Sequence, residues 1–277
     1  MTTPFFSVII PTYNRANFLA KALSSVLAQD FQDFEVIVVD DGSTDATKDY
    51  INTITDNRLI YIYQPHQGVS FARNRGVKKA SGEFICFLDS DDWFKKEKLR
   101  ITCDYIKKYP DIKIFHTEEI WYRNGSRFNP KLYHKKPDGD VFTNAVRLCS
   151  ISISTAAIKR ELFETIGLFD ESLPACEDYD FWLRATAKYP VKLIPKYLTL
   201  KEGGHHDQLS KQFVAMDRFR IYALNKILES ASLNPKQNAV AAKELRRKCA
   251  IYIKDAAKRG KVKDVEFYTR LMEKYRD

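Results

Sequence analysis

The sequence predicts an α/β protein in which a mostly parallel sheet is flanked by helices. Over the first 115 residues, short apolar segments of β-type composition alternate with segments of helical periodicity. Polar clusters follow three of the predicted strands, and parallel sheets bind ligands beyond the carboxyl ends of their strands. From residue 208 to the end the pattern is helical. These observations predict a ligand site in the first part of the chain and a helical extension after it.

Five strands and four helices are predicted in the first half. The first strand is an apolar run that stops at Pro11, and the second, FEVIVV, is rich in β-branched residues. The first helix is predicted from apolar residues at helical spacing between Phe18 and Leu27. The strands are expected at residues 5–10, 34–39, 59–63, 83–88 and 112–115, and the helices at residues 17–29, 45–56, 69–80 and 95–109.

The second half is less regular. Residues 123–139 have the composition of a loop, and residues 140–200 mix shorter helices and strands, as in an α+β unit. Pro235 suits a first helical position, and Gly260 suits a break between two helices. Three helices are therefore predicted after Gly203 and Gly204, at residues 208–230, 235–259 and 261–275.

Composition excludes several classes of protein. The 277 residues are 44% hydrophobic, which is enough for a substantial core. No stretch approaches the roughly 18–20 apolar residues of a membrane-spanning helix, and the N-terminus lacks the basic segment of a secretory signal. Five cysteines without CxxC spacing argue against a disulfide framework and a cysteine zinc site. A reducing cytoplasm is the expected location.

The net charge of +9 lies in the C-terminal quarter. Residues 1–210 carry 28 Lys and Arg against 28 Asp and Glu, whereas residues 211–277 carry 17 against 8. This basic segment suggests an anionic partner, such as a membrane surface, a phosphorylated lipid or a nucleic acid; the alternative is a solvated helical face. Nucleic acid is ranked last, because the first 210 residues are neutral overall and acidic at their strand ends.

Carboxylates dominate the motifs. No GxGxxG, GxxxxGKS/T, GxSxG or HExxH motif is present, which removes the signatures of most dehydrogenases, kinases, serine hydrolases and zincins. Asp89, Ser90, Asp91 and Asp92 directly follow a predicted buried strand. Three carboxylates in four residues repel one another, and oxygen ligands favour a hard divalent cation, Mg²⁺ or Mn²⁺. Alternatively, one of them caps the helix predicted from residue 95.

Two further acidic clusters have both a structural and a chemical interpretation. DDGSTD, at residues 40–45, follows the second strand; its carboxylates can bind a base or a ribose hydroxyl, and turn formation explains them equally well. EDYD, at residues 177–180, begins a predicted helix, where acidic residues are stabilising. One of its carboxylates could instead be a general base that takes a proton from an attacking hydroxyl.

Four segments occur in an order that resembles family 2 glycosyltransferases: SVIIPTYNR, VVDDGSTD, QGVSFARNRGVKKASGEFICFLDSDD and CEDYDFWLRA. The resemblance covers residues 5–210 and implies the GT-A fold, a Rossmann-like sheet with an α+β acceptor half. It also implies an inverting transfer from a nucleotide-diphosphate sugar, expected to be UDP-linked, to an acceptor hydroxyl. The implied cofactor is Mn²⁺ or Mg²⁺, and the implied acceptor is a saccharide or lipid-linked saccharide of polysaccharide or lipopolysaccharide biosynthesis.

The resemblance divides the chain into three parts. Residues 1–115 would form the nucleotide-sugar-binding half, and residues 116–207 the acceptor-binding and catalytic half of the same domain. Residues 208–277 would be a basic helical extension, about which the resemblance says little. This extension suits a peripheral contact with the inner face of a membrane, or a homodimer interface.

The resemblance also assigns roles to residues. The nucleotide-binding set is Pro11, Thr12, Tyr13, Asp41, Arg73, Asp89 and Ser90. Within it, Tyr13 would stack on the base and Asp41 would recognise it. Asp178 would be the catalytic base, Glu177 would orient neighbouring groups or the acceptor, and Trp93 would line the donor or acceptor pocket unless it belongs to the core.

The metal ligands are implied in the same way. Asp91 would bind the cation, with Asp92 as an alternative because the alignment of DSDD can shift by one residue. His206, or His205 beside it, could complete the metal shell or donate to the diphosphate; a surface loop is the alternative.

Two other functions remain open at this point. One is a catalytically silent, nucleotide-sugar-binding scaffold subunit. The other is a sugar-phosphate nucleotidyltransferase, although PTYNRAN is a poor match to the glycine-rich basic loop of those enzymes.

Overall fold

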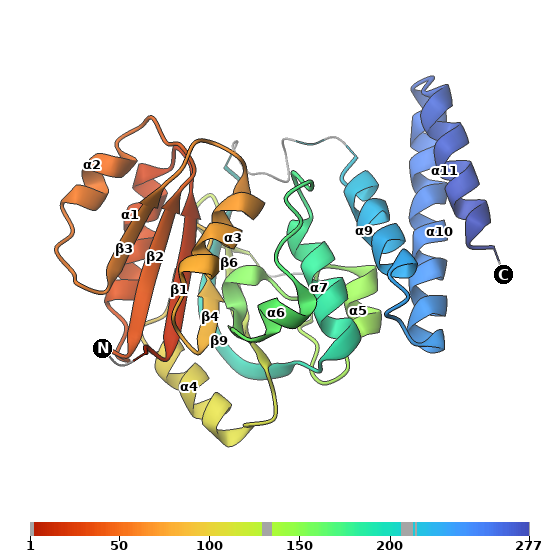
Figure 1. The fold of residues 1–277 in the computed structure, drawn as a ribbon. Coiled ribbons are helices and arrows are strands. Elements are labelled where there is room, and N and C mark those ends of the chain that lie inside the picture. Colours follow the sequence, from red (N-terminus) through yellow and green to blue (C-terminus); the bar gives the residue numbers. More distant parts are fainter. Residues whose placement is uncertain (1–2, 129–134, 206–212, 214, 277) are drawn as a thin grey trace.

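The computed structural model describes residues 3–128, 135–205, 213 and 215–276. In this part of the chain, nine strands form one sheet in the order β3-β2-β1-β4-β8-β6-β9-β5, with β7 paired to β6. Helices cover both faces of the sheet, and the C-terminal helices lie at the side of the molecule away from β3 (Figure 1).

The first four strands in spatial order are parallel. They are β3 (Leu59–Tyr63), β2 (Phe34–Asp40), β1 (Phe6–Thr12) and β4 (Phe84–Phe87). The connecting helices are α1 (Ala16–Leu27), α2 (Thr47–Asn52) and α3 (Val69–Lys79). Alternate residues of β1 enter different core clusters, with Val8 in the cluster that includes α1 and Ile9 in the cluster that includes α3. This part of the structure follows the predicted alternation of strands and helices.

β1 continues through Pro11 and Thr12, two residues beyond its expected end. The register of β1 with β4 stops at Ile9 and Phe87, whereas the register with β2 continues to Thr12 and Asp40. Proline lacks an N–H group, but β4 has already ended where that group would be needed. Pro11 therefore removes no ladder hydrogen bond to β4, and Thr12 is carried to the carboxyl end of the strand.

Beyond β4 the sheet is mixed. Its strands are β5 (Asp92–Phe94), β6 (Ile114–Arg123), β7 (Ser126–Phe128), β8 (Ala156–Lys159) and β9 (Lys192–Gly203). The helices are α4 (Lys98–Lys108), α5 (Phe142–Arg147), α6 (Leu162–Ile166) and α7 (Glu177–Lys188), with a 3-10 turn η2 (Ile153–Thr155). β8 is antiparallel to β4 and β6, β5 is antiparallel to β9, and β6 and β9 are parallel. β6 crosses the boundary expected between residues 115 and 116, so both halves share one sheet.

The turn and the second strand of the β6–β7 hairpin lie within residues 123–139, which were expected to form a loop. Asn124 and Gly125 join the two strands with φ angles of 51° and 75°. Positive φ at both central residues is the conformation of a type I′ turn, for which Asn-Gly is favoured. The turn dipeptide was therefore a hairpin signal that the loop-like composition of its surroundings concealed.

β5 is a strand that the sequence did not predict, and it changes the interpretation of the acidic cluster. Asp92 begins β5, and α4 begins only at Lys98. The N-cap residue of α4 is Glu97, and it makes no side-chain capping hydrogen bond. The alternative in which the acidic cluster caps this helix is therefore wrong. A three-residue strand is too short for periodicity to reveal it.

Three helices close the chain: α9 (Asp217–Glu229), α10 (Pro235–Lys258) and α11 (Val262–Lys274). Residues 208–212 of the first expected helix lie outside the described residues. α10 begins as predicted, with Pro235 in its first turn and a capping box between Asn234 and Gln237. Apolar residues of α9 and α10 share a core cluster with α5 and α7. None of the helices in the described ranges is long and apolar enough to cross a membrane.

Candidate functional site

Three carboxylates meet at the carboxyl end of β4. Asp89 and Asp91 follow this strand, and Asp92 begins β5. One carboxylate oxygen of each residue lies within 4.8 Å of the others. The backbone N–H of Asp89 donates to Ser154 Oγ at 3.1 Å, and Asp92 is the cross-strand partner of Lys201. The acidic motif is thus a cluster held in place by η2 and β9.

Basic side chains surround this cluster. Arg15 Nη1 and His205 Nε2 both contact Asp91 Oδ2, at 2.9 and 2.8 Å. Lys201 Nζ lies 3.7 Å from Asp92 Oδ2. Burial, together with repulsion from a neighbouring carboxylate, raises the pKa of Asp91. Burial also raises the pKa of Asp92, although Lys201 opposes this shift. Repulsion within the cluster therefore persists despite these basic side chains.

The donor set fits a divalent cation. All three ligands are carboxylates, which Mg²⁺ and Mn²⁺ prefer. Asp92 Oδ2 is buried and has no hydrogen-bond partner among the described residues. Asp91 and Asp92, the two ligands expected from the sequence, therefore lie in one cluster with Asp89. The third expected ligand, His206, lies outside the described residues, and its neighbour His205 contacts Asp91.

A buried arginine joins this cluster to the start of α7. Arg73, on α3, is 4% exposed. Its Nη2 donates to Asp89 Oδ1 at 2.7 Å, and its Nη1 donates to Glu177 Oε1. Burial tends to raise the pKa of both carboxylates; the charge of Arg73 brings the pKa of Asp89 below its usual range, whereas that of Glu177 stays raised. Two motifs that are far apart in the sequence are thereby held together by one side chain.

Asp178 lies in the first turn of α7, beside Glu177. Its Oδ1 accepts the N–H of Tyr179 at 2.7 Å, and its Oδ2 lies 3.2 Å from Cys149 Sγ. Burial tends to lower the pKa of Arg73, but the nearby Asp89, Glu177 and Asp178 carboxylates raise it. Contacts at both oxygens fix the orientation of the Asp178 carboxylate.

Asp41 lies at the carboxyl end of β2 and organises the loop that precedes α3. It is 3% exposed, and its carboxylate accepts Gln64 Nε2 at 2.6 Å and two backbone N–H groups of that loop at 3.0 and 2.8 Å. His66 Nδ1 lies 2.8 Å from Asp41 Oδ2, and its ring stacks on Tyr13 with centroids 4.0 Å apart. Thr12 Oγ1 is buried nearby, without a hydrogen-bond partner in the described ranges. His66 was missed because nothing in the sequence around it indicates these contacts.

The other predicted residues lie around the cluster. Pro11 is buried in β1, and Ser90 is 5% exposed. Lys21 Nζ lies 3.0 Å from the Trp93 ring centroid, and Tyr122 stacks on Trp93 at 5.8 Å. Trp93 therefore joins β5 to α1 and β6, and its role toward a donor or an acceptor stays a prediction.

Sequence reasoning missed the segment CSISIS, at residues 149–154. Cys149 contacts Asp178, Ser152 Oγ donates to Glu119 Oε1 at 2.9 Å, and Ser154 Oγ accepts a backbone N–H of the acidic cluster. The isoleucines between these residues are buried in the core. Alternation of small polar residues with isoleucine was the available signal, because it sets polar side chains between buried apolar ones; the backbone is extended at Ser152 and then enters η2.

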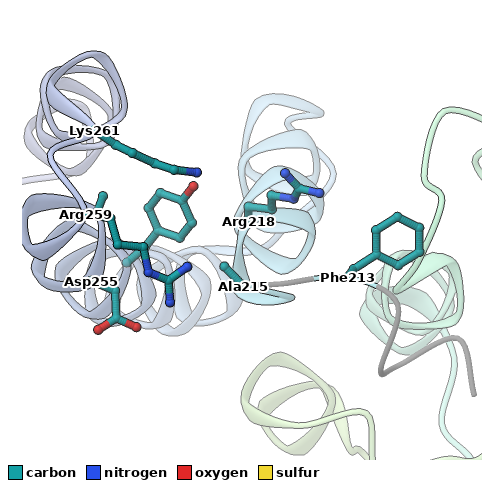
Figure 2. A pocket seen from close by; sticks show the side chains of 8 residues that line it. Phe213, Ala215, Arg218, Asp255, Arg259 and Lys261 are labelled. Carbon is teal, nitrogen blue, oxygen red and sulfur yellow. The ribbon is translucent and has the colours of Figure 1, made fainter. Parts of the chain in front are cut away.

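A separate cavity lies among the C-terminal helices. It has a volume of about 250 Å³ and lies between α9 and the turn from α10 to α11 (Figure 2). The residues that line it are Phe213, Ala215, Arg218, Tyr252, Asp255, Ala256, Arg259 and Lys261. None of them belongs to the motifs above, so this cavity is not part of the carboxylate site.

Residues 7–167 match the family model described as Glycosyl transferase family 2. A glycosyltransferase of Rickettsia felis, itself uncharacterized, is 34% identical over 224 residues, which is 79% of this chain and 37% of the relative. This chain therefore spans little more than a third of that relative.

Solved structures give the same fold. The 1–349 fragment of S. aureus TarS, in complex with UDP-GlcNAc, superimposes with a TM-score of 0.74 at 26% identity, covering 88% of this chain and 72% of that one. A mannosyltransferase from Pyrobaculum calidifontis, in complex with GDP-Man and Mn²⁺, gives 0.65 at 19% identity, covering 99% and 85%. The expected GT-A fold, a curled sheet flanked by helices, is confirmed.

The first prediction concerns Arg73. Arg73→Met would leave Asp89 and Glu177 buried without their shared cation, and breaking a buried ion pair typically costs about 3–5 kcal/mol. We expect a loss of unfolding free energy of this order, measured by urea denaturation at neutral pH. Arg75→Met is the matched control, because Arg75 is exposed on the same helix. Equal stability of the two variants would contradict a structural role for the Arg73 contacts.

Proposed function

The chain belongs to glycosyl transferase family 2, and on that basis we propose that it transfers a sugar from a nucleotide-diphosphate sugar to an acceptor hydroxyl. One observation carries the proposal: Arg73 contacts both Asp89 and Glu177, so it links the carboxylate cluster to the start of α7, where Asp178 is the candidate base. UDP-GlcNAc in the TarS complex supports a UDP-linked donor. The proposed acceptor is a saccharide or lipid-linked saccharide of polysaccharide or lipopolysaccharide biosynthesis.

The nucleotide would bind beyond β1 and β2. Tyr13 is 42% exposed and offers an aromatic face for a base. Thr12 Oγ1 offers a hydroxyl group that has no hydrogen-bond partner in the described part of the chain. Asp41 acts in this proposal mainly through the loop that it organises, because its carboxylate already accepts several hydrogen bonds. Ser90 would complete the donor side beside Asp89.

Asp89, Asp91 and Asp92 would hold a divalent cation, Mn²⁺ or Mg²⁺. When bound, the cation would neutralise charge on the diphosphate leaving group. The oxygen-only ligand set supports this proposal, and so does the Mn²⁺ in the Pyrobaculum calidifontis complex. Arg15 and His205 would fix the orientation of Asp91 through their contacts with its Oδ2.

Asp178 is the proposed general base. Transfer with inversion requires a hydroxyl to attack from the face opposite the leaving diphosphate, and a carboxylate at that side can take its proton. Asp178 is oriented by contacts at both oxygens. Arg73 holds the Glu177 carboxylate, and for this reason we assign Glu177 to positioning and not to proton transfer.

The nucleotide site is tested by calorimetric titration of UDP, GDP and dTDP into the protein, each with Mn²⁺ and with a chelator. We expect one nucleotide to bind at least about tenfold more tightly with Mn²⁺, and Asp91→Ala to lose this gain. Asp104→Ala, which changes an exposed carboxylate on α4, should keep it. A gain that survives in Asp91→Ala would contradict the metal assignment, and no binding under any condition would contradict the donor site.

The base is tested by Asp178→Asn. The substitution keeps the shape of the side chain and removes its ability to take a proton, so we expect nucleotide binding to persist and transfer to fall by about 10²–10⁴-fold. Transfer is measured as release of nucleoside diphosphate in the presence of acceptor. Glu164→Gln, an exposed change on α6, is the control. Unchanged transfer by Asp178→Asn would remove Asp178 as the base.

We further propose that the C-terminal helices contact an anionic membrane surface from its cytoplasmic side. One line of exposed basic residues runs along α10: Lys236, Lys243, Arg247, Lys254 and Lys258. Their spacing of four and seven residues keeps them on one helical face. Three more cations, Arg218, Arg259 and Lys261, line the nearby cavity (Figure 2). The five free cysteines support a reducing compartment.

This contact is tested by reversing charges on α10. A basic residue near an anionic bilayer contributes about 1 kcal/mol, so Lys243→Glu combined with Lys254→Glu should weaken binding at least about tenfold. Binding is measured by sedimentation with phosphatidylserine-containing vesicles. Lys48→Glu combined with Lys107→Glu makes the same change of net charge at exposed positions elsewhere. Equal binding by the two double variants would mean that net charge, and not this face of α10, determines vesicle binding.

A further inference from the structure

A buried glutamate and a pair of aromatic rings lie together on β6 and β7. Glu119 is 6% exposed. Its Oε1 accepts Trp121 Nε1 at 2.8 Å, Lys136 Nζ at 2.9 Å and Ser152 Oγ at 2.9 Å. Its Oε2 has no hydrogen-bond donor among the described residues. A buried carboxylate oxygen without a donor is unfavourable, so a hydroxyl group that reached this oxygen would gain a hydrogen bond that the described residues do not supply.

The aromatic pair lies directly beside this carboxylate. Trp121 and Phe128 are cross-strand partners in the β6–β7 hairpin, and their rings stack with centroids 6.3 Å apart and planes inclined by 22°. Phe128 is 41% exposed, so part of its ring faces solvent beside Trp121. The Trp121 N–H group joins the aromatic pair to Glu119.

Two paths connect this cluster with the carboxylates of the donor site. Ser152 donates to Glu119, and two residues later Ser154 accepts the N–H of Asp89. Lys201 on β9 is the cross-strand partner of both Asp92 and Trp121, so its neighbours on the two strands share one face of the sheet. The aromatic pair therefore lies on the same face of the sheet as Asp92 of the acidic cluster.

The chemistry of the cluster matches a sugar ring. A pyranose has an apolar face of C–H groups, which packs on an aromatic ring, and a rim of hydroxyl groups, which need paired donors and acceptors. Glu119 supplies a charged acceptor and Lys136 a charged donor. Burial tends to raise the pKa of Glu119, but Lys136 and Lys201 lower it to about 2. Glu119 is therefore ionised at neutral pH and suits hydrogen bonding better than proton transfer.

We infer that Glu119, Trp121, Phe128 and Lys136 form the subsite that binds the sugar ring of the acceptor. The ring packs on the exposed face of Phe128 beside Trp121, and one of its hydroxyl groups donates to Glu119. This inference rests on the proposed function, because it names the acceptor side of the same site.

The experiment is saturation-transfer NMR on the full chain, with UDP and Mn²⁺ present. The probes are the methyl glycosides of glucose, galactose, mannose and N-acetylglucosamine. We expect at least one probe to give signals, strongest at the protons of one ring face, as stacking on an aromatic ring requires. Phe128→Ala, a change at an exposed position, should reduce the affinity for that probe about tenfold.

Two more variants separate recognition from folding. Glu119→Gln keeps the size of the side chain but removes its charge, and it should also weaken binding of the probe. Tyr197→Ala removes another exposed aromatic ring, on β9, where the cross-strand partner of Tyr197 is Glu118, and it should leave binding of the probe unchanged. The inference is overturned if no glycoside gives a signal, or if Phe128→Ala binds the probe as the unsubstituted chain does.

Nucleotide titration of the same samples distinguishes this inference from the proposed function. Phe128→Ala should bind UDP with unchanged affinity, because the donor site does not include the hairpin. Glycoside signals without binding of any nucleotide would contradict the proposed transfer reaction and support the sugar subsite. Nucleotide binding without glycoside signals would contradict the subsite and support the donor site.

Discussion

The site depends on one buried cation that three segments share. Arg73 reaches from α3 to Asp89, after β4, and to Glu177, at the start of α7. The next residue, Asn74, donates to the carbonyl of Phe169 at 2.9 Å and accepts the N–H of that residue at 2.9 Å. Two consecutive residues of α3 thus hold both the acidic cluster and the chain that leads into α7. Without a cation between them, the buried Asp89 and Glu177 carboxylates would repel each other, and no ion pair would stabilise the contact between the segments that carry them.

The strands and helices that could be predicted are those with enough residues to show a period. α1 and β2 have clear apolar patterns, and their predicted limits differ from the observed ones by no more than two residues. β5 and β7 have three residues each, so their existence depends on pairing with β9 and β6 and not on any local pattern. The sequence did not indicate which strands of the mixed half of the sheet are parallel and which are antiparallel, because the direction of a strand relative to its neighbours follows from tertiary pairing.

The residues of the candidate site also differ in whether the sequence alone could indicate them. The acidic clusters at residues 89–92 and 177–180 could be singled out because their types and their positions after a strand or at a helix start carry chemical meaning in the sequence itself, and the family resemblance then assigned roles to Asp89, Asp91 and Asp178. Glu119 and Lys201 could not be found, because each is an ordinary charged residue within a long strand, and its importance comes from burial beside charges of other strands. A motif therefore identifies residues whose type and position already carry chemical meaning, whereas residues whose importance comes from burial beside other strands appear only when the strands are paired.

Charge balance links these supporting residues to the proposed reaction. Arg15 contacts Asp91, Lys201 lies beside Asp92, and Arg73 is shared by two carboxylates. Each of these cations already faces a carboxylate, so the diphosphate of a donor would enter a site whose positive charge is largely committed. A divalent cation held by the acidic cluster would supply the positive charge that the diphosphate needs. The diphosphate would in turn supply oxygen ligands to the cation. In the proposed function, binding of the donor and binding of the cation are therefore mutually dependent, and each raises the affinity for the other by the same factor.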